Sequence, residues 1–175
     1  MPLPPPLPLP TRRATTRLAH AIAVAIAPGD LVVLDGTLGA GKTFLVRAML
    51  RALGVPHEVA VPSPTFTLMN EYSTTIGARV PVLHADLYRL LEGEDAGSRV
   101  DDEIAGLGLR ARRGDGWAVV VEWGGGHVSA LGGEGVRIEL RTEPARTAFV
   151  EPLGTRGEEL ARDVSARFAS LSTAR

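Results

Sequence analysis

The apolar and polar positions along the chain follow helical patterns at its two ends. Over residues 18–26 apolar side chains recur every four residues, which predicts a helix that Thr15 or Thr16 caps. A similar stripe over residues 160–171 predicts a C-terminal helix, and Thr155 and Glu158 have the spacing of a capping box at its start. Between residues 92 and 116, Gly and charged residues prevail, so we expect only a short helix within a loop there.

Short apolar runs between these helices predict the strands of one sheet. The runs 31–34, 80–87 and 118–121 are mostly apolar, as in strands buried on both faces of a parallel sheet. Residues 66–72 alternate and predict a half-exposed strand before a turn near Gly77, whereas 136–140 and 147–150 predict a closing hairpin. We therefore expect an α/β fold: a mainly parallel sheet with an antiparallel extension and helices on both faces.

The first ten residues consist largely of Pro and Leu, with few backbone donors and no helical period. This composition predicts a flexible, extended tail over residues 1–12, with a ligand for a Pro-binding groove as the alternative. Residues 13–175 then form a single domain, long enough to fold unaided. No run approaches the ~20 apolar residues of a membrane span, and His20 interrupts a stretch that otherwise resembles a secretory signal. We expect a cytoplasmic protein without membrane contact.

Composition excludes several functions. The 175 residues include no Cys and no Gln, and Lys42 is the single lysine among 19 basic residues. The chain therefore has no disulfide, thiol nucleophile or Cys-type zinc site, and no glutamine to orient a water molecule. A net charge of −1 disfavours binding to nucleic acid mainly through its phosphates. The position of the one lysine becomes informative.

Lys42 lies in a segment that matches the phosphate-loop pattern G-x-x-x-x-G-K-[ST], between a predicted strand and a predicted helix over 42–53. Its glycines let successive N–H groups point at one anion, and the start of the helix adds its positive dipole end. The lysine would approach the β- and γ-phosphates, and the hydroxyl that follows would bind Mg²⁺. The candidate nucleotide-binding residues are Gly36, Thr37, Leu38, Gly39, Ala40, Gly41, Lys42, Thr43 and Phe44.

The same residues favour ATP over GTP. Guanine-specific phosphate-loop proteins use an Asn-Lys-x-Asp loop, but the only Asn, Asn70, is followed by Glu71, and the only lysine is already in the phosphate loop. The missing Gln argues against an ABC transporter ATPase, and it predicts slow intrinsic hydrolysis.

Two carboxylates follow the buried runs. Asp86 and Glu122 end neighbouring strands, and parallel strands gather their carboxyl ends at one edge of a sheet. We expect Thr43, Asp86 and Glu122 to bind Mg²⁺, and Lys42, Asp86 and Glu122 to be catalytic. His84 shares a strand face with Asp86, where a structural hydrogen bond is the simpler role. Trp123 could stack on the base or a partner, with core packing as the alternative.

Four segments, in this order, resemble the TsaE (YjeE) ATPases of bacterial tRNA modification. They are residues 36–43, Ser63-Pro64-Thr65-Phe66-Thr67-Leu68, His84-Ala85-Asp86-Leu87-Tyr88-Arg89-Leu90 and Val121-Glu122-Trp123, and the resemblance runs from about residue 15 to 146. It departs from the family between residues 89 and 117, and at Gly124–Gly126, where a proline is common.

The resemblance implies a P-loop NTPase-like α/β fold and Mg²⁺-dependent ATP hydrolysis, required for N6-threonylcarbamoyladenosine next to the anticodon of tRNA. It implies TsaD and TsaB as partners, with tRNA reached only indirectly. By position, Asp86 would place metal or water and Glu122 would be the Walker-B-like carboxylate. Thr65 would belong to a loop that senses the γ-phosphate, and Thr15 and Arg146 would flank the nucleotide.

Two alternatives stay open at this point. The first is a small-molecule kinase, in which Asp86 would accept a proton from the acceptor and Arg110, Arg112 and Arg113 would form a lid. A solvated run of charge is the simpler interpretation of these arginines. The second is direct tRNA binding, which the near-neutral charge disfavours.

Overall fold

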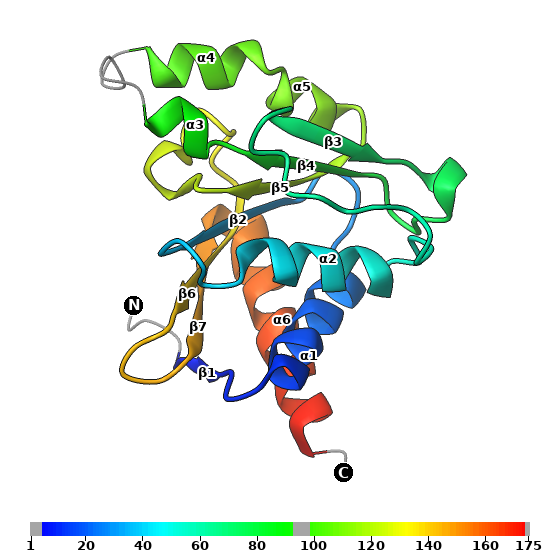
Figure 1. Cartoon of the computed structure of the whole chain (residues 1–175), viewed down its shortest axis with the longest axis vertical. Helices are drawn as coiled ribbons and strands as arrows, with labels where there is room; N and C mark the ends of the chain where they lie inside the picture. The colour runs from blue at the N-terminus through cyan, green and yellow to red at the C-terminus, as the bar shows by residue number, and fades with distance from the viewer. Residues whose placement is uncertain (1–4, 93–98, 174–175) are drawn as a thin grey trace.

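The structure is a computed structural model that describes residues 5–92 and 99–173. Its seven strands form one sheet in the order β1-β7-β6-β2-β5-β4-β3 (Figure 1). The neighbours β6, β2, β5 and β4 run parallel, whereas β3, β7 and β1 pair antiparallel with the strands beside them. This arrangement confirms the expected α/β class. The strands are β1 (Leu7–Pro8), β2 (Leu31–Gly36), β3 (Met69–Tyr72), β4 (Val82–Asp86), β5 (Ala118–Glu122), β6 (Gly135–Arg141) and β7 (Thr147–Leu153).

Helices cover both faces of the sheet (Figure 1). Alternate residues of β2 point to opposite faces, as the two-residue period of a strand requires: Val32 and Leu34 join one apolar cluster, and Leu31 and Val33 the other. Helices α1, α2 and α6 pack on the first cluster, and α4 and α5 on the second. The helices are α1 (Arg12–Ala25), α2 (Lys42–Ala52), α3 (Tyr88–Leu91), α4 (Val100–Gly106), α5 (Leu109–Gly114) and α6 (Gly154–Thr173). Short 3₁₀ turns lie at Thr74–Ile76 and Gly125–His127.

The predicted helices form, but their starts differ from expectation. Thr11, not Thr15 or Thr16, caps α1, because its hydroxyl accepts from the N–H of Ala14 at 3.1 Å. The C-terminal helix begins at Gly154, so Thr155 lies inside it and is not its cap. Between residues 99 and 116 there are two short helices, α4 and α5, where one was expected. Among the described residues, no helix is both long and apolar enough to cross a membrane.

The predicted strand over residues 66–72 is shorter than expected. Strand β3 begins only at Met69, Leu68 has a left-handed backbone with φ +63°, and Phe66 is 83% exposed in a turn. The alternation of apolar residues was misleading here because the hydroxyls of Ser63 and Thr65 bind Asp86, which draws this segment away from the ladder. The expected turn is confirmed at Gly77, which has φ +94°.

The prediction of a flexible tail is wrong for residues 7–9. Leu7 and Pro8 pair with Ala148 and Thr147 of β7, and the N–H of the buried Leu9 donates to Arg146 O at 2.9 Å. In an antiparallel ladder, N–H groups alternate between the neighbouring strand and the outside. The leucines supply the inward donors, and Pro8, which has none, takes an outward position. The Pro-Leu alternation therefore suits an edge strand whose outer side offers few donors to another sheet. Residues 1–4 lie outside the described part.

Gly157 in the first turns of α6 gives a test of this packing. Alanine in place of glycine inside a helix normally stabilises by about 1 kcal/mol. A Cβ at Gly157, however, would lie 2.0 Å from the carbonyl oxygen of Gly135. We expect Gly157→Ala to destabilise by about 1–3 kcal/mol, which lowers the melting temperature by roughly 3–10 °C.

Gly106 is the matched control, because a Cβ there would meet no atom of the described residues within 4 Å. Gly106→Ala should leave the melting temperature, followed by circular dichroism, unchanged or slightly higher. Equal behaviour of the two variants would contradict the close approach of α6 to β6.

Candidate functional site

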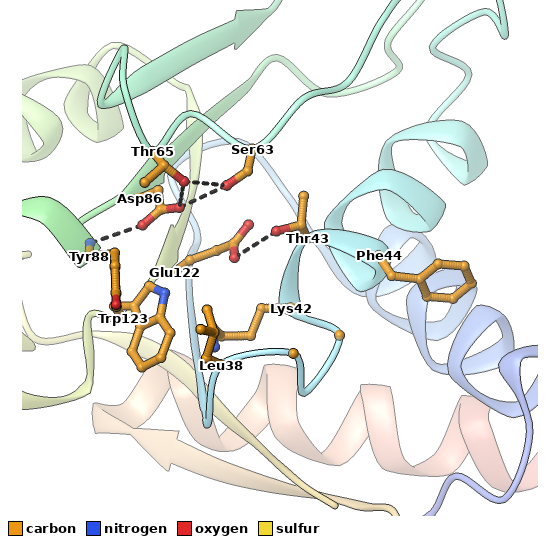
Figure 2. A pocket seen from close by; sticks show the side chains of 12 residues that line it. Leu38, Lys42, Thr43, Phe44, Ser63, Thr65, Asp86, Tyr88, Glu122 and Trp123 are labelled. Atoms are coloured by element: carbon orange, nitrogen blue, oxygen red, sulfur yellow. Dashed lines mark hydrogen bonds between the residues drawn. The ribbon is translucent and has the colours of Figure 1, made fainter.

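The loop between β2 and α2 has the geometry of an anion-binding loop. Gly41 precedes α2 with φ +104°, and within the described residues no side chain caps the helix, so its first N–H groups are left open. Figure 2 shows this loop and the start of α2 beside the cavity. Gly36 has φ +135°, and a Cβ there would lie 2.4 Å from Leu140 O. Two of the motif glycines are therefore required by the backbone itself.

Lys42 is folded back onto this loop. Its Nζ donates to Gly36 O at 2.7 Å and to Thr37 O at 3.0 Å, and it lies 3.5 Å from the centroid of the Trp123 ring. Lys42 is 5% exposed, and this burial lowers the pKa of its ammonium group. The negative charges of Glu122, Asp86 and Asp35 act in the opposite direction and offset part of the lowering. Because this buried ammonium has little contact with water and bonds to two neutral carbonyl oxygens, binding of an anion such as phosphate beside it is favourable.

The two predicted carboxylates lie side by side at the ends of β4 and β5. Asp86 and Glu122 are direct partners in the parallel ladder, and each is only 2% exposed. Glu122 Oε2 accepts from the hydroxyl of Thr43 at 3.0 Å, and Oε1 lies 2.9 Å from Nε2 of the buried His84. The structural hydrogen bond expected of His84 therefore exists, and its partner is the carboxylate of the site.

Asp86 is held by a second set of contacts. Its Oδ2 accepts from the hydroxyls of Ser63 and Thr65, both at 2.8 Å, and its Oδ1 accepts from the N–H of Tyr88 at 2.9 Å. Figure 2 shows these groups converging on the carboxylate from the segment before β3 and the start of α3. Thr65 was expected here, but Ser63 and Tyr88 were not. The Ser-Pro-Thr and Asp-Leu-Tyr spacing was the available signal.

Most predicted residues line one cavity of about 410 Å³. Its walls are Leu38, Gly39, Gly41, Lys42, Thr43, Phe44, Ser63, Thr65, Asp86, Tyr88, Glu122 and Trp123. Five predicted residues do not line it. Ala40 is buried, Gly36 and Thr37 face the other side of the loop, and Thr15 is 2% exposed on α1 among core residues. Arg146 lies beside the loop, because a Cβ at Gly41 would be 3.3 Å from its Nη1.

Trp123 belongs to the cavity wall. Its backbone is left-handed with φ +67°, and its N–H donates to Leu34 O at 2.8 Å. The indole ring lies between Lys42 and the ring of Tyr88, whose centroid is 5.1 Å away (Figure 2). Asp35 accepts from the N–H of Gly125, and a Cβ at Gly125 would lie 1.8 Å from Asp35 Oδ2, which explains the glycine two residues after Trp123.

Comparison with known proteins agrees with this geometry. Residues 9–148 match the model of a family described as "Threonylcarbamoyl adenosine biosynthesis protein TsaE". The chain belongs to the TsaE family. Proteins with the name tRNA threonylcarbamoyladenosine biosynthesis protein TsaE are similar to it: 37% identical in Streptomyces coelicolor, covering 75% of this chain and 81% of that protein, and 31% identical in Bacillus subtilis, covering 86% and 87%.

A TsaE protein of Aquifex aeolicus is 49% identical over 43% of this chain, and the match spans only 55% of that protein. The crystal structure of Bacillus subtilis YdiB superposes with a TM-score of 0.69 at 26% identity, covering 89% of this chain and 90% of that one. The fold resemblance thus extends over most of both chains.

The donors in the cavity fit the magnesium ion that the TsaE resemblance implies. Two buried carboxylates and the Thr43 hydroxyl supply oxygen atoms, which Mg²⁺ prefers, and it usually takes the rest of its ligands from phosphate and water. In the described residues no group of three or more His, Cys, Asp or Glu side chains is arranged so that it could hold a metal ion by itself.

The lid expected of a kinase does not form from α5. Arg113 donates to the carbonyls of Gly29, Leu131 and Glu134, and Arg112 pairs with Glu71 at 2.6 Å. Neither residue lines the cavity described above, and Arg110 borders a different hollow next to Arg113. Arg112 and Arg113 thus fasten α5 to the fold and form neither a lid nor a merely solvated run of charge, whereas Arg110 is exposed, as a solvated charge would be.

His84 gives a prediction about the orientation of Glu122. Removing a group that holds a metal-binding side chain typically costs 10- to 100-fold in activity or metal affinity. We expect His84→Ala to lower ATP hydrolysis roughly 10-fold or more, while ADP binding measured without Mg²⁺ changes little. His84→Gln can still donate to Glu122 and should recover part of the rate.

Melting temperatures of both variants separate this effect from unfolding, because the change leaves a buried acceptor without its partner. Hydrolysis at the wild-type rate in His84→Ala would contradict the role.

Proposed function

We propose that this chain binds ATP together with Mg²⁺ and hydrolyses it slowly. One observation carries the proposal: the phosphate loop, the Thr43 hydroxyl and the carboxylates of Asp86 and Glu122 converge on one cavity. ATP is favoured over GTP because the chain has no Asn-Lys-x-Asp loop.

The residues of the cavity have different roles in this reaction. The open N–H groups at the start of α2 and the ammonium of Lys42 bind the phosphates and stabilise the charge that develops on them. When bound, Mg²⁺ would supply further charge neutralisation of the phosphates, with Thr43, Asp86 and Glu122 as its protein ligands. Asp86 also orients the hydroxyls of Ser63 and Thr65, next to the place where a γ-phosphate or an attacking water would lie.

The tRNA role rests on the family. The related proteins carry the name tRNA threonylcarbamoyladenosine biosynthesis protein, and we propose that the present chain serves the same modification in the cytoplasm. By the family resemblance its partners are TsaD and TsaB, and hydrolysis would reset their complex. Contact with tRNA would be indirect, in keeping with the net charge of −1.

A small-molecule kinase uses the same kind of loop, so the experiment must distinguish it. The purified protein is incubated with Mg²⁺ and γ-labelled ATP, with and without a metabolite pool, and with and without TsaB and TsaD. We expect slow release of labelled phosphate alone, faster release with the partners, and co-purification with them that depends on ATP. A labelled metabolite formed without the partners would overturn the ATPase assignment. Salt-sensitive tRNA binding by the isolated protein would overturn indirect contact.

A further inference from the structure

The N-terminal strand β1 lies outside the family match, which begins at residue 9. It nevertheless fixes the start of β7. Leu7 and Pro8 pair with Ala148 and Thr147, and the N–H of Leu9 donates to Arg146 O at 2.9 Å. The Leu9 side chain is 1% exposed and belongs to the main core cluster. Residues 7–9 thus contact three consecutive residues of the chain, 146–148.

Arg146 is the residue among these three that faces the phosphate loop. Its Nη1 lies so close to Gly41 that a Cβ at this glycine would be only 3.3 Å away. The Arg146 side chain is exposed, and among the described residues no ion pair involves it. It is therefore an exposed cation next to Gly41, the residue that precedes α2 and lines the cavity.

The backbone around Arg146 would be loosely held without β1. Residues 142–146, which connect β6 to β7, are all exposed, and on the β6 side the loop is closed by the pairing of Arg141 with Thr147. An exposed loop must lose backbone freedom before one of its side chains can make a fixed contact, and this loss of conformational entropy opposes the contact. The bond from the Leu9 N–H has already ordered the Arg146 backbone, with the buried Leu9 side chain as the anchor.

We propose that Leu9 is a positioning residue for nucleotide binding. Through its backbone bond and its buried side chain it holds Arg146 beside Gly41, where the guanidinium binds the phosphates of the nucleotide. The inference rests on the proposed ATP site and adds to it a contribution from the N-terminal strand.

The experiment compares four variants in the full chain. Leu9→Pro removes the N–H that bonds to Arg146 and keeps the segment extended. Leu7→Pro is the matched control, since its N–H faces Ala148 and not Arg146. Arg146→Ala removes the cation, and the fourth variant combines Leu9→Pro with Arg146→Ala. The dissociation constants of MgATP and of ADP are measured by calorimetry, and melting temperatures are recorded for every variant.

We expect Arg146→Ala to weaken nucleotide binding about 3- to 10-fold, as for loss of a partly exposed charged contact. Leu9→Pro should also weaken nucleotide binding, whereas Leu7→Pro should weaken it by less than about twofold. The combined variant should bind no more weakly than Arg146→Ala alone, because Leu9 acts through Arg146. Independent losses that add in the combined variant, or wild-type affinity in Leu9→Pro, would overturn the proposal.

A second measurement avoids Leu9→Pro in case that variant fails to fold. If Leu9 and the nucleotide both hold Arg146, binding must in turn stabilise the pairing of β1, because such coupling is reciprocal. Hydrogen exchange of the Leu7 and Leu9 amides should slow when MgATP binds to the wild type, and this slowing should disappear in Arg146→Ala. Slowing that persists in Arg146→Ala contradicts the proposal. Absence of any nucleotide binding by the wild type would instead contradict the ATP site itself.

Discussion

Lys42→Ala is expected to reduce ATP hydrolysis by about 10²- to 10³-fold, the usual loss when one preorganised group that stabilises transition-state charge is removed. The ammonium already lies within the loop, 2.7 Å from Gly36 O, with Trp123 on its other side, and needs only to exchange weak neutral acceptors for phosphate. Far-UV circular dichroism should be unchanged, because the lysine bonds only to loop carbonyls. Phosphate release in single- and multiple-turnover assays measures the effect.

Lys42→Arg is the matched variant for charge. Arginine keeps the positive charge, but its planar fork does not fit a pocket shaped for a compact ammonium, so we expect a loss of hydrolysis nearly as large as in Lys42→Ala.

Because Lys42 is the only lysine, an amine-reactive reagent should modify this side chain and the N-terminal amine alone. MgATP should protect Lys42 and leave the N-terminus reactive, as peptide mass mapping would show. Equal labelling of Lys42 with and without nucleotide would remove it from the site.

Local sequence was sufficient for the centre of the site. The phosphate loop is one continuous segment, and both carboxylates directly follow apolar runs, so strand direction alone places Asp86 and Glu122 at the same edge. The α/β class followed from the same runs. These residues could be predicted because the phosphate loop depends only on neighbours in the chain, and the carboxylates depend only on the rule that parallel strands end at the same edge of a sheet.

The features that were missed depend on partners far away in the chain. The pairing of Leu7–Pro8 with β7 joins residues about 140 positions apart, and nothing in the Pro-Leu segment itself indicates that partner. The hydrogen bond from Ser63 to Asp86 likewise joins residues 23 positions apart, and it could not be seen in the alternation of apolar residues that predicted a strand over residues 66–72. Thr15 was placed by resemblance alone, whereas its position on α1 follows from how that helix packs on the core.

Asp86→Asn and Glu122→Gln are expected to lose most Mg²⁺-dependent hydrolysis, with nucleotide binding in the absence of Mg²⁺ largely kept. Each change conserves size and removes one negative charge from a pair that lies side by side and is only 2% exposed. The effects should differ in kind. Glu122 bonds to Thr43, so Glu122→Gln should raise the Mg²⁺ concentration needed for half-maximal rate by roughly 10-fold or more.

Asp86 holds Ser63, Thr65 and the N–H of Tyr88, so Asp86→Asn should chiefly lower the maximal rate, by about 10²-fold, even at saturating Mg²⁺. An amide in place of the carboxylate has one acceptor oxygen where three donors converge, so the loop that carries Thr65 loses a fixed position beside the phosphates. Glu151→Gln, which changes a carboxylate on β7 outside the cavity, is the matched control for the loss of one charge. Wild-type rates and wild-type Mg²⁺ dependence in both site variants would contradict the assignment of Asp86 and Glu122 as metal ligands. Loss of ADP binding in both variants would show instead that these carboxylates maintain the fold of the phosphate loop and do not act in hydrolysis.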